Sequence, residues 1–225
     1  MSKPSAPSNL KGPTDPHPEC DRCERLRAFV LSWRDPEPAW HNRPVRTFGD
    51  PEARLLIVGL APGLKGANRT GRPFTGDYAG DLLYETLGKY GLTDGQYDRR
   101  PDDGLQLRGA AITNAVRCVP PQNKPTGVEI TNCRPFLSAT IAAYQDLKCI
   151  LALGRIAHES VLRALSLRLK EYPFTHGALH DLPDGPILAD SYHCSRYNTN
   201  TGRLTPEMFD QVFTGIASVL NNRSA

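Results

Sequence analysis

LLIVGLAPGLKGANRTGRPFTGD, at residues 55–77, joins a short apolar run to a loop of glycine, proline and one aromatic residue. The run LLIVGLA (55–61) is typical of a buried parallel strand, and an open α/β sheet binds its ligands where such strands end. The loop lacks the glycine spacing of a dinucleotide-binding turn and the GK[ST] ending of a phosphate-binding loop. It therefore indicates a site that does not hold phosphates in either of those ways.

Three further apolar runs have the character of buried strands: AAITNAV (110–116), CILALG (149–154) and PILADSYH (186–193). Helical patterns alternate with them, and Thr205 is expected to cap a closing helix that begins at Pro206. Strands alternating with helices imply crossover connections and a parallel sheet covered on both faces. The sequence thus predicts an α/β fold, a three-layer α/β/α sandwich with a central four-stranded parallel sheet.

Length and composition describe one globular unit. The chain has 225 residues, of which 39 % are hydrophobic and 23 % charged, and no run approaches the ~18 apolar residues of a membrane span. Residues 1–17 are expected to form a disordered leader without a secretory signal, and residues 18–225 a single domain. Residues 96–107 are expected to be an exposed insertion. The predicted location is cytoplasmic, on the nucleoid; a net charge of +3 permits nucleic-acid binding without requiring it.

The cysteines suggest metal binding. Cys20 and Cys23 form a CxxC motif, and Cys118 and Cys133 flank a proline-rich loop. Two such pairs can supply four soft ligands, which suit zinc or an iron–sulfur cluster, while free thiols remain the simpler alternative. Cys149 lies in a core strand, and Cys194 could pack beneath the site.

Three separated motifs in order, GLAPGLKGANRTGRPFTGD, ITNAVRCVPP and YHCSRYNTNTGRLT, resemble the iron–sulfur uracil-DNA glycosylases, and among them the branch called family 5 or type B. The resemblance implies a four-stranded parallel sheet between helical layers. It also implies a structural [4Fe–4S] cluster held by Cys20, Cys23, Cys118 and Cys133. This chain has Leu60 where the related type A branch has an acidic residue, so the water-activating carboxylate is absent from that position.

A glycosylase needs a pocket for one base flipped out of DNA. The predicted substrate-binding residues are Gly59, Leu60, Ala61, Pro62, Gly63, Phe74, Asn114 and His193. Phe74 offers an aromatic face on which a base can stack, and the glycines, with Gly66, allow close backbone approach. Asn114 can both donate to and accept from the imide edge of uracil. The competing interpretations are that Phe74 fills the core and that Asn114 caps a turn.

The predicted catalytic residues are His193, Asp77 and Asn114. His193 could donate a hydrogen bond to the base oxygen on which negative charge grows as the glycosidic bond breaks. Asp77 could orient water or stabilise positive charge on the sugar, or it could only cap the following helix. The family's loop after the last strand meets the DNA minor groove. By that resemblance Arg196, Tyr197, Asn198 and Arg203 are predicted to bind DNA, with Tyr197 as a wedge; the alternative is a solvated loop.

The predicted function is therefore a monofunctional, monomeric DNA-repair glycosylase that removes uracil, and by resemblance hypoxanthine or other damaged bases, and leaves an abasic site. Two alternatives stay open. One is a related glycosylase with a shifted base preference, or one that attaches covalently to the abasic site. The covalent branch carries an extra basic, His-containing insertion near the last strand, and we identify none before His193. The other is a non-catalytic iron–sulfur or zinc module that only binds DNA.

Overall fold

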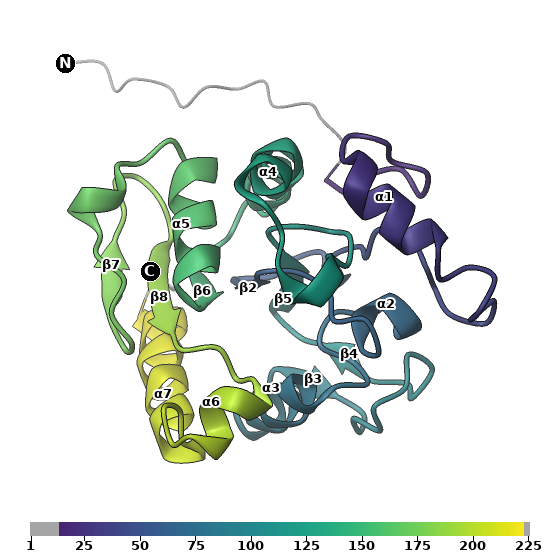
Figure 1. Ribbon diagram of the computed structural model, residues 1–225. Helices are drawn as coiled ribbons and strands as arrows, with labels where there is room; N and C mark the ends of the chain where they lie inside the picture. Colours follow the sequence, from purple (N-terminus) through teal and green to yellow (C-terminus); the bar gives the residue numbers. More distant parts are fainter. Residues whose placement is uncertain (1–13, 223–225) are drawn as a thin grey trace.

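A mixed six-stranded sheet carries helices on both of its faces in the computed structural model, which describes residues 14–222 (Figure 1). The sheet order is β1-β5-β2-β6-β8-β7, and β3 pairs with β4 in a separate hairpin. The strands are β1 (Phe48–Gly49), β2 (Leu55–Gly59), β3 (Thr93–Asp94), β4 (Gln106–Leu107), β5 (Ala110–Asn114), β6 (Cys149–Leu153), β7 (Leu179–Asp181) and β8 (Ile187–Ser191). The α-helices are α1 (Glu24–Leu31), α2 (Ala67–Thr70), α3 (Tyr78–Lys89), α4 (Gly127–Ala143), α5 (Arg155–Ala164), α6 (Arg196–Asn200) and α7 (Pro206–Asn222).

The four central strands β5, β2, β6 and β8 are parallel, which confirms the predicted core of the sheet. The short strands β1 and β7 add antiparallel edges that the sequence pattern did not indicate. Each central strand ends one or two residues before its apolar run does, because the chain there leaves the sheet to build loops. These loops emerge together at the carboxyl edge of the sheet, where an α/β fold places its ligands.

Alternate residues of the central strands pack into two separate hydrophobic cores, one on each face of the sheet. Leu55 and Ile57 of β2 pack with α3 and α7, whereas Leu56 and Val58 pack with α4 and α5. Figure 1 shows these two pairs of helices on opposite faces of the sheet. Successive side chains of a strand point to opposite faces, so a run buried on both sides has no polar alternation. This is why the four predicted strands read as continuous apolar runs.

Two helix starts illustrate how local sequence fixes the elements. The Thr205 hydroxyl accepts a hydrogen bond from Met208 N at 3.2 Å, so α7 begins as predicted. Helix α4 begins at Gly127 because Thr126 and Glu129 form a capping box. The T-x-x-E spacing of this box is itself a signal for a helix start in the sequence.

The prediction that residues 96–107 form an exposed insertion is wrong in part. Leu105 and Leu107 are buried in the core on the α3 side, and Asp103 forms a buried ion pair with Arg72. Residues 98–102 in its middle are exposed, as are Gln96, Gly104 and Gln106. The segment therefore combines a solvent-facing tip with a buried base.

Residues 1–13 of the predicted leader lie outside the described residues. At the start of the described chain, Asp15 Oδ1 accepts a hydrogen bond from Arg117 Nη1 at 2.6 Å, so that part of the predicted leader contacts the core. No helix among residues 14–222 combines the length and the apolar character needed to cross a membrane.

Candidate active site

A cavity of about 640 Å³ opens at the carboxyl edge of the sheet. Its walls come from the loop after β2, the start of α3, the end of β5 and the loop after β8. The lining residues include seven of the eight predicted substrate-binding residues, namely Leu60, Ala61, Pro62, Gly63, Phe74, Asn114 and His193. The eighth, Gly59, lies directly behind two of them. Residues that lie far apart in the sequence, from Leu60 to His193, thus line one cavity.

Gly59 allows the walls of the cavity to close over the end of β2. An ideal Cβ at this position would lie 2.5 Å from Asn114 Oδ1 and 2.7 Å from Phe74 Cζ. Real Cβ atoms do not come so close to other heavy atoms, so only glycine leaves room for both side chains. The close approach that glycine permits brings Phe74 and Asn114 together.

Asn114 is buried with an unused hydrogen-bond acceptor. The residue is 2 % exposed, and its Oδ1 accepts no hydrogen bond from any residue of the described chain. A buried polar atom without a partner costs free energy unless a ligand or water satisfies it. Because Asn114 lines the cavity, its amide is available to a ligand there.

His193 presents a neutral imidazole to the same cavity. Its ring lies 5.8 Å from the Phe74 ring between centroids, with the two planes 29° apart. Burial lowers the pKa of His193 to about 4, because the cationic form is poorly solvated there. The imidazole forms no hydrogen bond within the described residues, so at neutral pH it can donate one N–H to a ligand.

Asp77 has one carboxylate oxygen on a helix and the other beside the glycine loop. Oδ1 accepts a hydrogen bond from Gly80 N at 3.2 Å and caps α3. Oδ2 lies over Gly63 and Gly66, where an added Cβ would meet it. Burial raises the pKa of this carboxyl above its ordinary value. The geometry therefore supports capping and a place in the cavity wall at the same time.

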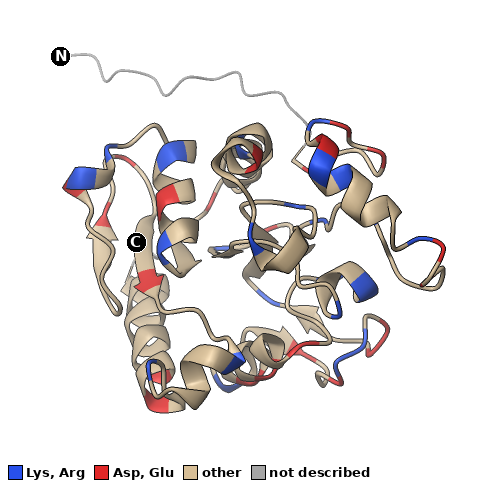
Figure 2. Cartoon of the chain, viewed as in Figure 1, with Lys and Arg blue, Asp and Glu red and all other residues tan. Residues whose placement is uncertain are grey.

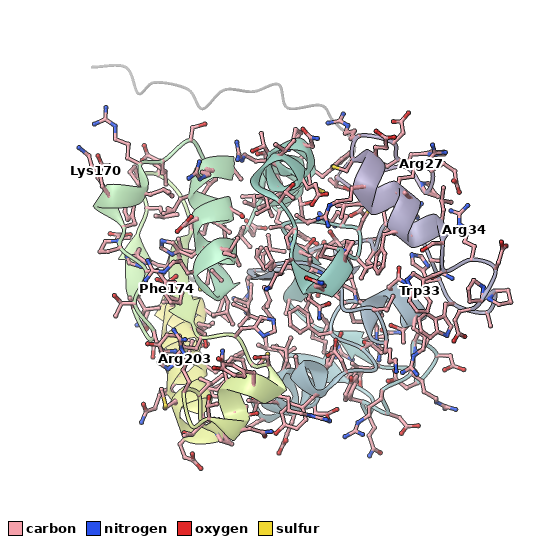
Figure 3. All side chains as sticks on the ribbon, viewed as in Figure 1. Arg27, Trp33, Arg34, Lys170, Phe174 and Arg203 are labelled. Carbon is pink, nitrogen blue, oxygen red and sulfur yellow. The ribbon has the colours of Figure 1, made fainter. Side chains whose placement is uncertain are left out.

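The predicted DNA-binding residues lie on or after α6, and of these four Arg196 lines the cavity. Tyr197 is 73 % exposed, and the Arg196 guanidinium lies 5.1 Å from the Tyr78 ring centroid. Asn198 is partly committed to the fold, since its Nδ2 donates to the His193 carbonyl at 2.8 Å. Arg203 lines a neighbouring cavity with Phe174, and Figure 3 shows both on the β7 and β8 side of the molecule.

Positive charge is not confined to that edge. Figure 2 shows Lys and Arg on α1, α2, α5 and α6, with Asp and Glu interspersed among them. Many arginines of the described chain are paired with acids, as in Arg25–Glu129 and Arg99–Asp81. Surface positive charge therefore does not distinguish this cavity from the rest of the described surface. The polar groups that line the cavity do.

The four predicted cysteine ligands line one small cavity beside α1 and α4. Burial raises the pKa of Cys118 and raises that of Cys133 to about 11, so a nearby cation is needed to stabilise thiolates there. Arg117 N donates to Cys133 Sγ at 3.3 Å, and Asn132 Nδ2 donates to Cys23 Sγ at 3.7 Å. Hydrogen bonds to sulfur are typical of iron–sulfur ligands.

Within the described residues, no three of these sulfurs lie mutually within 4.8 Å. A single zinc ion with Zn–S bonds of about 2.3 Å would bring its sulfurs to about 3.8 Å from one another. Cys149 and Cys194 are both buried, and Cys194 Sγ donates to Ala79 O at 3.3 Å beside the main cavity.

Comparison with known proteins decides the family. A family model described as the uracil DNA glycosylase superfamily matches residues 46–216. The chain belongs to the uracil DNA glycosylase superfamily. This confirms the resemblance read from the three sequence motifs.

Individual relatives indicate the branch of the superfamily to which the chain is more similar. A protein named type-5 uracil-DNA glycosylase from Thermus thermophilus is 47 % identical over 203 residues, covering 86 % of this chain and 90 % of that protein. Another of the same name, from Mycobacterium leprae, is 42 % identical over 207 residues, covering 86 % and 88 %. A type-4 uracil-DNA glycosylase from Pyrobaculum aerophilum is 31 % identical over 153 residues, covering 68 % and 64 %. Similarity is thus higher to the type-5 relatives.

Several cavity residues of this glycosylase superfamily member were missed from the sequence. Asn123 lines the cavity from the loop between Cys118 and Cys133, with φ at +56°. Tyr78 lines it from the first turn of α3. Asn between prolines in PPQNKP is a turn signal that could have directed attention to Asn123. Nothing local marks Tyr78, since its place depends on how α3 is oriented.

A buried cluster of His158, His180 and Asp190 was also missed. Asp190 accepts from His158 Nδ1 at 2.7 Å and from His180 Nε2 at 2.8 Å. Its Oδ2 accepts as well from Thr175 N at 3.2 Å. These ligand-type atoms lie within 4.8 Å of one another, and here they satisfy each other by hydrogen bonds. The cluster holds the 172–180 segment against β8.

Gly59→Ala should lower the free energy of unfolding by about 1–3 kcal/mol, because the added methyl group overpacks against Asn114 and Phe74. The matched control is Gly127→Ala, where an added Cβ meets nothing within 4 Å at the start of α4. Urea denaturation of both variants measures the difference. Equal stability of the two variants would contradict the close packing over Gly59.

Proposed function

We propose that this protein is a monofunctional uracil-DNA glycosylase whose cavity receives one deaminated base extruded from DNA. It hydrolyses the N-glycosidic bond and leaves an abasic site. The observation that carries the proposal is the convergence of an aromatic face, an unpartnered amide and a neutral imidazole on one cavity, from Phe74, Asn114 and His193. Uracil is the principal substrate, and hypoxanthine and other damaged bases are further candidates.

Base recognition falls to Phe74 and Asn114. The Phe74 ring can stack on the base, which is worth about 1–3 kcal/mol. The free Oδ1 of Asn114 can accept the imide N–H of uracil, while its amide can donate to a neighbouring carbonyl oxygen. Pairing this buried oxygen removes its desolvation penalty, so a base with an N–H at this edge is preferred over one with only acceptors.

Departure of the base leaves negative charge on its carbonyl oxygens. His193 is neutral at pH 7, since its pKa lies near 4, and its one ring N–H can donate a hydrogen bond to that charge. Donors already oriented toward charge that develops only in the transition state lower the barrier directly. Uracil is also a better leaving group than a normal base, so this stabilisation favours its removal.

Asp77 acts on the sugar side of the bond. Its Oδ2, beside Gly63 and Gly66, can stabilise positive charge on the sugar carbon and accept a proton from the attacking water. Water oxygen then bonds to the sugar carbon as the bond to the base nitrogen breaks. The cap on α3 holds the carboxylate in place through its other oxygen. Leu60 supplies no carboxylate here, which leaves this role to Asp77.

DNA is held outside the cavity by the α6 region. Tyr197, the most exposed large hydrophobic side chain of the described residues, can fill the gap that the extruded base leaves. Arg196 and Arg203 can bind phosphates, and Asn198 orients the loop through the His193 carbonyl. We further propose that the protein acts as a monomer on uracil-containing DNA in the cytoplasm, at the nucleoid.

Cys20, Cys23, Cys118 and Cys133 would hold a [4Fe–4S] cluster. Their shared cavity and the hydrogen bonds to the sulfurs of Cys133 and Cys23 fit such a group. When bound, the cluster supplies a structural crosslink between the N-terminal segment and the loop after β5. The glycosidic chemistry uses other residues.

The direct test is excision from a duplex that contains one uracil, followed by alkali. The wild-type protein should produce a strand break at the uracil, and His193→Ala should slow single-turnover excision at least about tenfold at an unchanged melting temperature. Absence of any abasic product from the wild-type protein would favour a non-catalytic DNA-binding module. An unchanged rate in the variant would remove His193 from the mechanism.

Asp77→Asn separates chemistry from capping, because Asn caps a helix about as well as Asp. The variant should keep the wild-type melting temperature but excise uracil at least about tenfold more slowly at pH 7. Burial raises the pKa of Asp77, so wild-type activity should begin to fall, as the pH is lowered, above the ordinary Asp pKa of about 3.9. The variant should lack that acidic limb. A wild-type rate and profile would assign Asp77 to capping alone.

The purified protein should be brown and contain about four irons per chain. Cys118→Ser should lose the iron and part of the stability, whereas Cys149→Ala, in the buried strand β6, should retain the iron. Metal analysis and visible absorption measure both. A colourless protein that carries one zinc ion would refute the cluster.

A further inference from the structure

The turn that carries Phe74 has a backbone conformation that its own sequence does not favour. Phe74 has φ at +52°, in the left-handed region that usually takes glycine, and the residue is buried. Such a conformation in a bulky residue persists only when surrounding contacts fix it. The contacts that fix this turn therefore decide where the Phe74 ring points.

Tyr97 contacts the turn at Phe74 itself and just after it. Its hydroxyl donates to the Phe74 carbonyl oxygen at 3.2 Å and accepts from Gly76 N at 3.4 Å. Burial raises the pKa of Tyr97 to about 12, so the hydroxyl keeps the proton that it donates. Tyr84 adds a third contact, since its hydroxyl donates to the Pro73 carbonyl at 2.8 Å. One backbone group on each side of the strained residue is thus held by a tyrosine.

The buried ion pair between Arg72 and Asp103 fixes the same turn from its other end. Both guanidinium nitrogens bind the carboxylate at 2.7 Å, and the two side chains are 5 % and 1 % exposed. Arg72 Nε also donates to Thr75 Oγ1 at 2.7 Å. The pair therefore connects the residue just before Pro73 with the residue just after Phe74.

The two tyrosines and the Arg72–Asp103 ion pair pack against one another. The Arg72 guanidinium lies 5.5 Å from the Tyr84 ring and 5.7 Å from the Tyr97 ring, and those rings stack at 4.4 Å. Asp103 also accepts from Asp98 N and Leu105 N, both at 3.0 Å, so it shapes the segment that carries Tyr97. Gly80 allows α3 to approach, because a Cβ there would overlap the Phe74 carbonyl oxygen.

We propose that Tyr97, Arg72 and Asp103 are positioning residues for base excision: they hold residues 73–76 in the left-handed turn that directs the Phe74 ring into the base cavity. None of the three lines that cavity, so they act through Phe74. The polar segment 96–107 therefore contributes to the site through Tyr97 and Asp103. This inference rests on the proposed function, since it assigns Phe74 as the surface on which the base stacks.

Tyr97→Phe is the sharpest variant, because it removes only the hydroxyl and keeps the ring that stacks on Tyr84 near the Arg72 guanidinium. The matched control is Tyr90→Phe. The Tyr90 hydroxyl binds Asp210 O at 2.9 Å and Thr214 Oγ1 at 2.8 Å, between α3 and α7, and Tyr90 does not line the cavity. Tyr97→Phe should lower kcat/KM for uracil excision about fivefold or more, because the turn loses both hydrogen bonds of this hydroxyl, and Tyr90→Phe should lower it less than twofold.

A double-mutant cycle separates positioning from general loosening. In the Phe74→Leu background there is no aromatic face to direct, so Tyr97→Phe should change the excision rate less than twofold. Hydrogen exchange of the free protein gives a second readout. Amides of residues 73–80 should exchange faster in Tyr97→Phe and remain as in the wild type in Tyr90→Phe.

The ion pair has its own control in Arg99–Asp81, a bidentate pair with 67 % and 26 % exposure. Asp103→Asn should lower excision at least about tenfold, and Asp81→Asn less than twofold. An active wild type with Tyr97→Phe equal to Tyr90→Phe, or with fully additive effects of Tyr97→Phe and Phe74→Leu, would overturn this inference alone. A wild-type protein that leaves uracil in DNA would overturn the proposed function and the inference with it.

Discussion

At the end of β2 the chain carries no side chain, and the space that a Cβ of Gly59 would fill is shared by Asn114 and Phe74. These two residues come from the next strand of the sheet and from a turn fifteen residues beyond Gly59 in the sequence. Their meeting point fixes the back of the cavity, and His193 from β8's loop then closes it beside the Phe74 ring. The rest of the site depends on this approach, because a wider separation would leave the amide and the aromatic face too far apart to contact one base.

The polar groups of the cavity are each held in a state that suits a different part of the reaction. Asn114 has an unused acceptor, His193 is neutral, and burial raises the pKa of Asp77. A neutral donor matches charge that appears on a departing base, and a carboxylate matches charge on a sugar. Burial makes these groups costly in the empty protein, and the same burial strengthens their interactions with a substrate that excludes water.

The central strands and the location of the site could be predicted from the sequence, whereas contacts between distant residues and very short strands could not. The central strands were predicted because strands buried on both faces are continuous apolar runs. The site was predicted at the loops that follow these strands, and the roles of Phe74, Asn114 and His193 in it also depended on the resemblance of the motifs that contain them. Asp103 was not predicted. An acid in a polar stretch suggests solvent exposure, and only its partner Arg72, thirty-one residues earlier in the sequence, makes it buried. The edge strands β1 and β7 are too short to produce a pattern.

The cysteine site and the base cavity are connected by one loop. Residues 119–132 run between Cys118 and Cys133, and Asn123 in that loop lines the base cavity. On the other side, Arg117 donates its backbone N–H to Cys133 and its guanidinium to Thr47, whose hydroxyl contacts that of Thr113 beside Asn114. A structural cluster at these cysteines would therefore restrain two walls of the cavity without touching the substrate. Under the proposed assignment, such a cluster would keep a loop and a strand end in register around a base, in a hydrolysis that requires no electron transfer.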